Sequence, residues 1–446
     1  MSKERDLVRF CINLSFSDLS PKLVEHTKLV IMDCLGVIVG GFRAHLRYKK
    51  WAEEIKRIAP GSSTILGVGS KVEEAYAALA NGTVAPSLEL DEGNKFCGGH
   101  PSIHVIPAAL ALAEKENRNG KEFITAVVAG YEIASRIGRA TTPLREEIHP
   151  HGTWGVVGAA VAGARLLRLD PNQAYQAASI ASNYSLNAFF DAALEGATVR
   201  DTYCGVANFL GILSVRLSQN GFTGLNEGIV RQYAHLGQTG FQESCLSDSL
   251  GERFEISKDY FKVHVGCRST HGALDALNQI ISSRGPIILD EIAKIEVSTY
   301  ASAARLNNPN PKNALQARFS LPYAIAARLF YGSSGIDSFK DESITEEVVK
   351  LAQKVTVSEN PHFSSLGPEK RPTELTVHFH NGRKESSLID VPEGDGSKPY
   401  SLQILREKFM SLTSPGLGSG KAKNVLEKIE TIEATENVRS ITSLLV

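Results

Sequence analysis

The residues of this chain best suited to chemistry are histidines, carboxylates and cations gathered in four short segments. The first segment, LELDEGNKFCGGHPSIHVIP from Leu88, places three acids ahead of two histidines, His100 and His104. Two glycines directly precede His100, and glycine allows a backbone that can aim a side chain into a cleft. The acids are Glu89, Asp91 and Glu92. An ordinary solvated loop has the same composition, so both interpretations stay open.

Metal binding is one chemistry that this first segment could support. His100 and His104 stand four residues apart, as in a helical metal-binding pair. Pro101 lies between them and the glutamate of an HExxH motif is missing, so we predict no metal. A divalent-metal hydrolase built on Glu89, Asp91 and the two histidines remains an alternative.

Two further segments stand directly ahead of helices rich in small residues. EEIHPHGTWG carries His149 and His151, and GATVRDTYCG carries Arg200. A helix N-terminus favours anionic groups, so imidazoles and a cation at this place suit an acidic ligand. The alternatives are histidines with no function at the surface and a structural ion pair between Arg200 and Asp201.

The fourth segment, YFKVHVGCRSTHGALDA from Tyr260, is the most informative. It packs five polar or reactive side chains into ten residues: Lys262, His264, Cys267, Arg268 and His271. Lysine and arginine together fix carboxylates, while a histidine or cysteine can move a proton. The segment lies where the helical part of the chain gives way to a mixed part, and such junctions form clefts. A basic surface turn is the alternative.

Hydrophobic periodicity divides the chain into these two parts. Residues 1–255 carry helical spacing in segment after segment, and the same spacing returns over 400–446. Residues 256–399 mix strand-like alternation with short helical runs. We therefore expect a mainly α protein with an α+β second domain: a large all-helical domain formed by both chain ends, and a smaller inserted α+β domain.

Two turn signals refine this division. Asn381-Gly382 follows the alternating run ELTVHFH, which predicts a hairpin with a type I′ turn. The polar stretch VPEGDGSK over 391–398 is predicted to be the linker through which the chain re-enters the helical domain.

Composition excludes several classes of protein. The 446 residues carry 48 Lys and Arg against 49 Asp and Glu, and 42% are hydrophobic, which is typical of a soluble globular protein. A net charge of −1 gives no overall grip on nucleic acid. The absence of an apolar run of about 18 residues or of a secretory signal predicts no membrane association and a cytoplasmic location. The six scattered cysteines fit reducing conditions.

In order and spacing, these segments resemble the MmgE/PrpD family, whose members include 2-methylcitrate dehydratase, cis-aconitate decarboxylase and an iminodisuccinate epimerase. The resemblance covers most of the chain, including VIMDCLGVIVGG near the start and NALQARFSLPYAIAARL farther on. It implies a large helical domain with an inserted α+β domain, a homodimer, no cofactor, and a small di- or tricarboxylate as substrate.

The resemblance also implies which residues act. The family's active-site histidines fall on His100 and His149, and its lysine on Lys262. Adding the candidates from the residues themselves, we expect His100, His149, Lys262 and Cys267 to be catalytic, and the substrate to be bound by Glu89, Asp91, Arg200, Arg268 and His271. Four positions depart from the family pattern: Glu89 stands for an aspartate, Gly93 for a threonine, Arg200 for a lysine and Cys267 for a histidine. We expect the general use of the site to be kept. The particular reaction should differ from that of the decarboxylase, because an arginine, unlike a lysine, cannot act as a base at accessible pH.

The chemistry that these relatives share is proton movement at a carbon next to a carboxylate. Fixed cations stabilise the charge that develops there, and two imidazoles serve as base and acid. Asp91 or Glu89 would orient His100. We expect a lyase of the 2-methylcitrate dehydratase kind; cis-aconitate decarboxylation, or epimerisation with Lys262 or Cys267 as a second base, are the alternatives. A helical scaffold without enzymatic activity is the remaining alternative.

Overall fold

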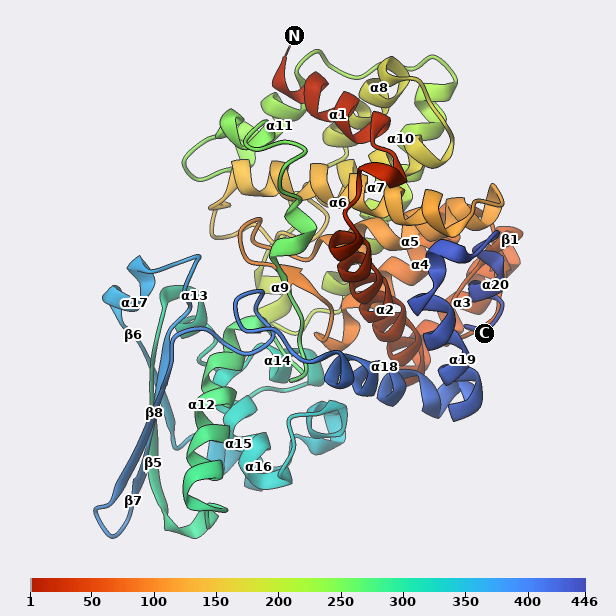
Figure 1. The fold of residues 1–446 in the computed structure, drawn as a ribbon. Helices are drawn as coiled ribbons and strands as arrows, with labels where there is room; N and C mark the ends of the chain where they lie inside the picture. Colours follow the sequence, from red (N-terminus) through yellow and green to blue (C-terminus); the bar gives the residue numbers. More distant parts are fainter. Residues whose placement is uncertain (1) are drawn as a thin grey trace.

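Helices make up most of the chain, and one four-stranded sheet stands apart from the main helical body (Figure 1). The computed structural model describes residues 2–446. The predicted class, mainly α with some β structure, is confirmed. The domain boundaries at residues 255 and 400 stay a prediction.

The helical body is built mainly from the first half of the chain. Small residues allow its central helices to cross closely: a side chain at Gly130 would place its Cβ 2.7 Å from the Gly158 carbonyl oxygen. Side-chain caps start several helices, as Ser20 does for α2 by accepting the Leu23 N–H at 3.2 Å. The helices are α1 (Lys3–Asn13), α2 (Pro21–Ala44), α3 (Leu46–Ile58), α4 (Glu74–Val84), α5 (Pro101–Lys115), α6 (Gly120–Thr141), α7 (Gly155–Leu166), α8 (Pro171–Asn183), α9 (Asp191–Leu194), α10 (Val199–Gln219) and α11 (Gly228–Leu236).

The smaller lobe is a mixed sheet with helices packed on one face (Figure 1). The strand order is β6-β5-β7-β8, and only the β5–β6 pair is parallel. The strands are β5 (Ile292–Thr299), β6 (Val355–Glu359), β7 (Thr373–Phe379) and β8 (Lys384–Ile389). The helices of the lobe are α12 (Arg268–Arg284), α13 (Ala301–Ala304), α14 (Ala314–Arg318), α15 (Leu321–Tyr331), α16 (Glu346–Ala352) and α17 (Pro361–Ser365).

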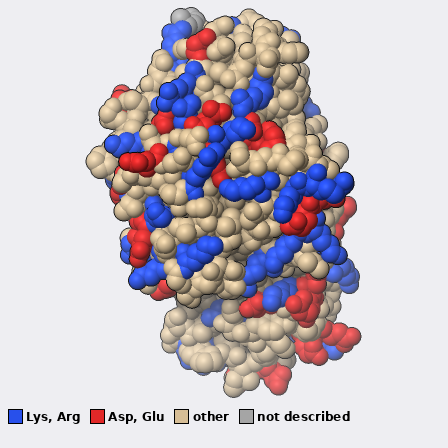
Figure 2. All heavy atoms as spheres, turned by 90° about the vertical axis from the view of Figure 1, so that its right-hand side faces the viewer, with Lys and Arg blue, Asp and Glu red and all other residues tan. Residues whose placement is uncertain are grey.

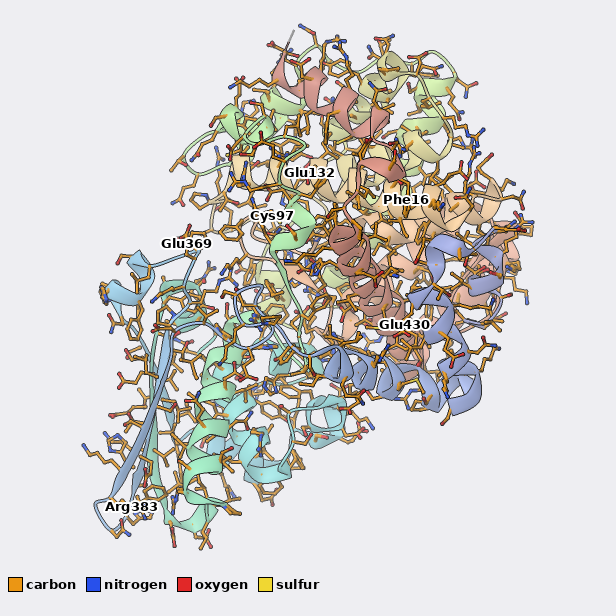
Figure 3. All side chains as sticks on the ribbon, in the orientation of Figure 1. Phe16, Cys97, Glu132, Glu369, Arg383 and Glu430 are labelled. Carbon is orange, nitrogen blue, oxygen red and sulfur yellow. The ribbon has the colours of Figure 1, made fainter. Side chains whose placement is uncertain are left out.

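The predicted β7–β8 hairpin is confirmed, but the type I′ turn is wrong. Such a turn needs positive φ at both central residues, and of the pair only Gly382 has it, at 85°. The Gly382 N–H donates to the Phe379 carbonyl at 3.0 Å, and the Phe379 N–H donates to the Arg383 carbonyl at 2.9 Å. These bonds close a three-residue loop that ends in a left-handed glycine. Figure 3 labels Arg383 at the far tip of the lobe.

The stretch predicted as a free linker, residues 391–398, is bonded to the rest of the protein. The Phe261 N–H donates to the Gly394 carbonyl at 3.0 Å, and Lys95 forms an ion pair with Asp395 at 3.0 Å. The segment therefore connects the two parts as a fixed element rather than a flexible one.

After this segment the chain returns to the helical body as α18 (Leu402–Leu417), α19 (Ser419–Glu430) and α20 (Arg439–Thr442), beside α2 (Figure 1). Lys408 of α18 reaches across to Asp33 of α2, with its Nζ 2.5 Å from Oδ1. Basic and acidic side chains intermingle over the face shown in Figure 2, as the near-zero net charge suggests.

Short elements that periodicity did not predict complete the fold. Two-stranded pairs join β1 (Pro60–Thr64) to β2 (Lys71–Val72), and β3 (Gly93–Asn94) to β4 (Asp259–Tyr260). The 3-10 turns are Phe16–Asp18, Ala85–Leu88, Glu243–Leu246, Glu255–Lys258, Leu289–Glu291, Ile336–Phe339, Asp341–Ser343 and Ile432–Ala434.

Within residues 2–446, no single helix is both long and apolar enough to cross a membrane. Taken together, α2 and α3 have the length and composition of a membrane-spanning segment, but the two helices meet at an angle of 101°.

Candidate active site

The short β3–β4 pairing brings the first and fourth chemical segments together. Gly93 pairs with Tyr260 and Asn94 with Asp259 in antiparallel register. The acids of the first segment lie just before β3 and Lys262 lies just after β4, so the pairing places them side by side. The predicted meeting of these two segments is therefore observed.

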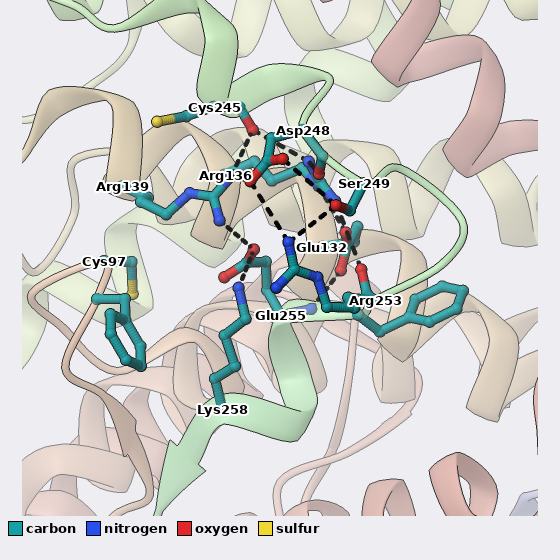
Figure 4. A network of polar contacts seen from close by, with 12 residues as sticks. Cys97, Glu132, Arg136, Arg139, Cys245, Asp248, Ser249, Arg253, Glu255 and Lys258 are labelled. Atoms are coloured by element: carbon teal, nitrogen blue, oxygen red, sulfur yellow. Dashed lines mark hydrogen bonds and ion pairs between the residues drawn. The ribbon is translucent and has the colours of Figure 1, made fainter. Parts of the chain in front are cut away.

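A buried ion network fixes the segment that leads into β4 (Figure 4). Glu255 accepts from Arg139 at 2.9 Å and from Lys258 at 2.8 Å, and its own backbone N–H donates to Glu132 at 2.7 Å. Arg136 also binds Glu132, at 2.6 Å. Because buried charges must be paired, this network holds the segment firmly against α6.

Four buried charges form the centre of the site, an ion cluster of Lys262, Asp91, Glu89 and Arg200. Lys262 Nζ lies 3.2 Å from Asp91 Oδ1 and 3.6 Å from Glu89 Oε2, and Arg200 forms an ion pair with Glu89. Burial works to raise the pKa of Asp91, but the charges of Lys262, His100 and Arg200 outweigh it and hold that pKa well below its usual range. Asp91 is therefore ionised at neutral pH.

Protein groups already surround the Arg200 guanidinium. Besides Glu89, its Nη1 donates to the Pro86 carbonyl at 3.2 Å and lies 3.6 Å from Asp201 Oδ1, and its Nε donates to His149 Nε2 at 3.4 Å. The ammonium of Lys262 has two acceptors, which leaves one of its three N–H groups for a ligand. Lys262 is therefore better placed than Arg200 to bind a carboxylate directly.

Glu89 adopts a backbone conformation that is rare outside glycine. Its φ is 51°, which costs a non-glycine residue about 1–2 kcal/mol. In this conformation its carbonyl accepts the Gly266 N–H at 3.3 Å while its side chain meets Arg200. Strain of this kind gathers at functional sites, because the surrounding structure must hold it.

His100 is oriented by an acid, as in an Asp–His dyad. Its Nδ1 lies 2.9 Å from Asp91 Oδ2 and 2.7 Å from the Glu92 carbonyl oxygen. Both neighbours are acceptors, so Nδ1 carries the proton, which it donates to the Glu92 carbonyl, and Nε2 is left with a lone pair. Its side chain is 13% exposed, and solvent or a ligand can therefore reach it.

His149 has both ring nitrogens beside N–H groups. Its Nδ1 accepts the backbone N–H of His151 at 3.0 Å, and Arg200 Nε approaches its Nε2 at 3.4 Å. Phe190 stacks on the ring, with the two centroids 5.2 Å apart. Burial, and next the positive charge of Arg200, lowers the pKa of His149 well below its usual value, which keeps the ring neutral.

His151 joins the site although the predicted set of site residues left it out. Its ring centroid lies 4.5 Å from that of His149 and 5.1 Å from that of His100. Its Nδ1 is buried and finds no hydrogen-bond partner within residues 2–446. The signal was present in the sequence, since His149 and His151 stand two residues apart ahead of the same helix.

Asp91, His100 and His151 each offer a ligand atom, and these atoms lie within 4.8 Å of one another. The donor set could hold a transition metal. However, Lys262 already contacts the carboxylate that a metal would need, so a second cation would be repelled there.

His104 cannot contribute to a metal site or to proton transfer. Its Nδ1 contacts the His100 carbonyl oxygen at 2.7 Å, and its Nε2 accepts the Gly152 N–H at 3.0 Å. Burial lowers its pKa to about 4, so the ring stays neutral. Both ring nitrogens are thus used to hold the loop ahead of α7 against the start of α5.

Three predicted residues lie beside the ion cluster rather than in it. Arg268 donates to the Glu393 carbonyl at 2.7 Å, and its guanidinium lies 4.7 Å from the ring centroid of Tyr260. His271 Nε2 lies 3.3 Å from the Gly266 carbonyl oxygen. Burial, and next the charge of Glu89, raises the pKa of the Cys267 thiol, which therefore stays protonated. The polar contacts of Arg268 and His271 are made within their own lobe.

Gly93 and Arg318 are parts of the site that sequence reasoning did not single out for a role of their own. A Cβ at Gly93 would lie 2.4 Å from the Tyr260 Oη and 3.0 Å from His100 Nδ1, so only glycine fits beside them. Arg318 donates to the Ser87 carbonyl at 2.6 Å, two residues before Glu89. Arg318 lies in the stretch NALQARF, but nothing in its spacing predicts this contact.

Comparison with known proteins adds to this geometry. Residues 5–250 match the MmgE/PrpD N-terminal domain, and residues 264–434 match the MmgE/PrpD C-terminal domain. A cis-aconitate decarboxylase-like protein of Aspergillus oryzae is 23% identical, over 99% of this chain and 96% of that protein. The cis-aconitate decarboxylase of Aspergillus terreus is 22% identical (99% and 95% covered), and that of Mus musculus 23% (97% and 91%). The chain belongs to the MmgE/PrpD family.

Proposed function

We propose that this protein is a lyase that acts on a small di- or tricarboxylate by removing a proton from a carbon next to a carboxylate. The observation that carries the proposal is His100, an imidazole held by Asp91 with its Nε2 lone pair free, beside a lysine with a free N–H. This ring can take a proton from carbon and deliver it to a leaving hydroxyl group, as a dehydration requires.

In this proposal His100 Nε2 takes the proton from carbon. The Asp91 carboxylate on Nδ1 holds the ring in position and stabilises the imidazolium that forms. The electron pair left by the proton spreads onto the adjacent substrate carboxylate. The ammonium of Lys262, buried and fixed by two acids, binds that carboxylate and stabilises the added charge.

The second half of the reaction expels the hydroxyl group. As the electron pair forms the carbon–carbon double bond, the carbon–oxygen bond breaks and the imidazolium of His100 returns its proton to the leaving oxygen. Water and an unsaturated acid are the products. His149, kept neutral by burial and next by Arg200, gives up no proton in this step; it lies beside the Arg200 guanidinium and helps to orient it.

A decarboxylation is the second candidate, and the curated relatives favour it. A carbon–carboxylate bond would then break in place of the carbon–oxygen bond, and an imidazolium would protonate the resulting carbanion. The names of the relatives support this reaction. The four departures from the family pattern, at Glu89, Gly93, Arg200 and Cys267, count against it.

Three other functions receive less support. An epimerase needs a second base, and the raised pKa of Cys267 removes the thiolate that would serve. A metal hydrolase built on His104 lacks a free ring nitrogen there. A scaffold without activity has no use for the strained Glu89 or the unpartnered Nδ1 of His151.

The test is a set of matched variants assayed with 2-methylcitrate and cis-aconitate. His100→Gln should lower turnover by about 10²–10⁴, the usual contribution of a general base, and His149→Ala should also lower turnover, because it removes the neighbour of Arg200. His362→Gln, at an exposed histidine on α17, is the control and should keep full activity. Near-complete activity in both site variants, with unchanged circular dichroism, would refute the proposal.

A further inference from the structure

A small cavity of about 180 Å³ opens behind Arg200, where the two parts of the protein meet. We call it the His45 cavity. It is lined by His45, Arg47 and Tyr48 around the start of α3, by Thr198 and Asp201 at the start of α10, and by Arg318 at the end of α14. No catalytic role proposed above uses His45, Arg47 or Thr198.

Arg318 is a buried cation with unused hydrogen-bonding capacity. The residue is 4% exposed, and its Nε has no hydrogen-bond partner within residues 2–446, although Nη1 donates to the Ser87 carbonyl at 2.6 Å. A buried N–H group of a guanidinium without an acceptor is costly, and an acceptor from a ligand would remove that cost.

The start of α10 supplies a second attraction for an anion. Thr198 is the N-cap of this 21-residue helix and makes no capping hydrogen bond with its side chain. The Arg200 and Asp201 N–H groups at this end donate to the Ala197 and Thr198 carbonyls at 3.1 Å, so the helix offers the cavity the partial positive charge of its N-terminus. Arg47, which is exposed, adds a guanidinium at the rim, 5.9 Å from the ring centroid of Tyr48.

Each of the two acids of the cavity has an oxygen that accepts a hydrogen bond. Asp201 accepts from the Tyr48 hydroxyl at 2.6 Å, and its other oxygen lies 3.6 Å from Arg200 Nη1 and accepts no hydrogen bond within residues 2–446. Asp341 accepts the Ala314 N–H at 2.6 Å. The cations therefore dominate the surroundings of His45: burial, and next Arg318 and Arg47, lowers its pKa to about 4.

We propose that the His45 cavity binds a small oxyanion, a carboxylate or phosphate group held by Arg47, Arg318 and the N-terminus of α10. Arg47 and α10 belong to the helical body and Arg318 to the smaller lobe, so the anion joins the two parts. Asp201, which lines the cavity, forms an ion pair with Arg200, and Arg318 donates to the carbonyl of Ser87, two residues before Glu89. Occupancy of the cavity therefore affects the ion cluster.

The experiment is titration calorimetry of the full chain with inorganic phosphate and with tricarballylate, a saturated tricarboxylate, at constant ionic strength. Arg47→Ala should weaken binding about tenfold, because it removes a charged hydrogen bond. Lys50→Ala, at an exposed lysine one turn farther along α3, is the matched control and should change affinity less than twofold. Arg47→Lys should retain part of the affinity.

The two ligands separate the two sources of the anion. If Arg47→Ala weakens the binding of phosphate alone, the cavity is a free-phosphate site. If it weakens the binding of tricarballylate alone, the cavity is a site for an organic acid. Either result supports the proposal. Phosphate binding that Arg47→Ala leaves unchanged, together with unchanged tricarballylate binding, overturns it. His100→Gln should leave the effect of Arg47→Ala on phosphate intact, so failure of the proposed catalysis is distinguishable from failure of this site.

Discussion

At the scale of single residues, contacts with the backbone decide what each imidazole can do. His104 has both ring nitrogens bonded to backbone groups, and His149 has its Nδ1 bonded to one. His100 keeps Nε2 free because Asp91 and a carbonyl share its Nδ1. The sequence predicted that His100 and His149 act, but their tautomers depend on the positions of backbone groups, which spacing does not determine.

Gly93 provides a test of the close packing at His100. Gly93→Ala should lower kcat/KM by at least about 10², because the new methyl group clashes with the Tyr260 hydroxyl and pushes His100 away from Asp91. Tyr260→Phe added to Gly93→Ala should restore part of the activity. Gly420→Ala, where a Cβ meets nothing within 4 Å, is the control. Equal activity of Gly93→Ala and the wild type would contradict this packing.

The trio Asp91, His100 and His151 gives a prediction about metal. Because Lys262 already neutralises Asp91, purified protein should contain substoichiometric metal, and a chelator should leave turnover unchanged. Elemental analysis and an assay with chelator measure both. One tightly bound zinc per chain, with activity lost on its removal, would instead support the hydrolase alternative.

At the scale of elements, the β3–β4 pairing brings the acids and the lysine together. Each strand has only two residues, too few for periodicity to show. The paired residues are far apart in the sequence: Gly93 and Tyr260 by 167 positions, Asn94 and Asp259 by 165. The long helices were predictable because their apolar spacing repeats over several turns. The meeting of the segments was inferred from the chemistry that they share and from the resemblance, and not from any strand signal.

This pairing is braced by an ion pair that depends on pH. His26 Nε2 of α2 lies 2.8 Å from Asp259 Oδ1 of β4. Burial works to lower the pKa of His26, but Asp259 outweighs it and raises that pKa above its usual value. The ion pair therefore makes its full contribution to the free energy of unfolding below about pH 6.5, the pKa of an unfolded histidine. This contribution is lost as the pH rises through the higher pKa of His26 in the folded protein.

The prediction concerns the difference in unfolding free energy between the wild type and His26→Asn. This difference should be about 1.5–3 kcal/mol at pH 6, as for a charged hydrogen bond, and much smaller at pH 9. Urea denaturation at the two pH values measures it, and His235→Asn, at an exposed histidine, should show no such change. A difference that grows with pH would contradict the pairing.

At the scale of the whole molecule, the C-terminal helices help to hold the site. Lys408 of α18 donates to Asp33 and to the Leu90 carbonyl, both at 2.5 Å. Asp33 in turn accepts the Glu92 N–H at 2.9 Å. The return of helical spacing after residue 400 predicted these helices, but their role as a support for the acid loop needs the three-dimensional contact.

Lys408→Met tests this support. The change leaves the buried Asp33 without its cation, so unfolding free energy should fall by about 3–5 kcal/mol. Lys423→Met, in an exposed ion pair with Glu427, should change it by less than about 1 kcal/mol. Denaturant titration of both variants gives the comparison, and similar values for the two would contradict a supporting role for α18.

The most direct test of the proposed chemistry is deuterium incorporation at the carbon next to a carboxylate. The wild type is incubated in D₂O with 2-methylcitrate, cis-aconitate and iminodisuccinate, and products and recovered substrates are examined by NMR. We predict turnover of at least one acid, with deuterium exchanged at that carbon, and loss of both turnover and exchange in His100→Gln. Turnover by His100→Gln at the wild-type rate, or no reaction and no exchange with any of the three acids, would contradict the proposal.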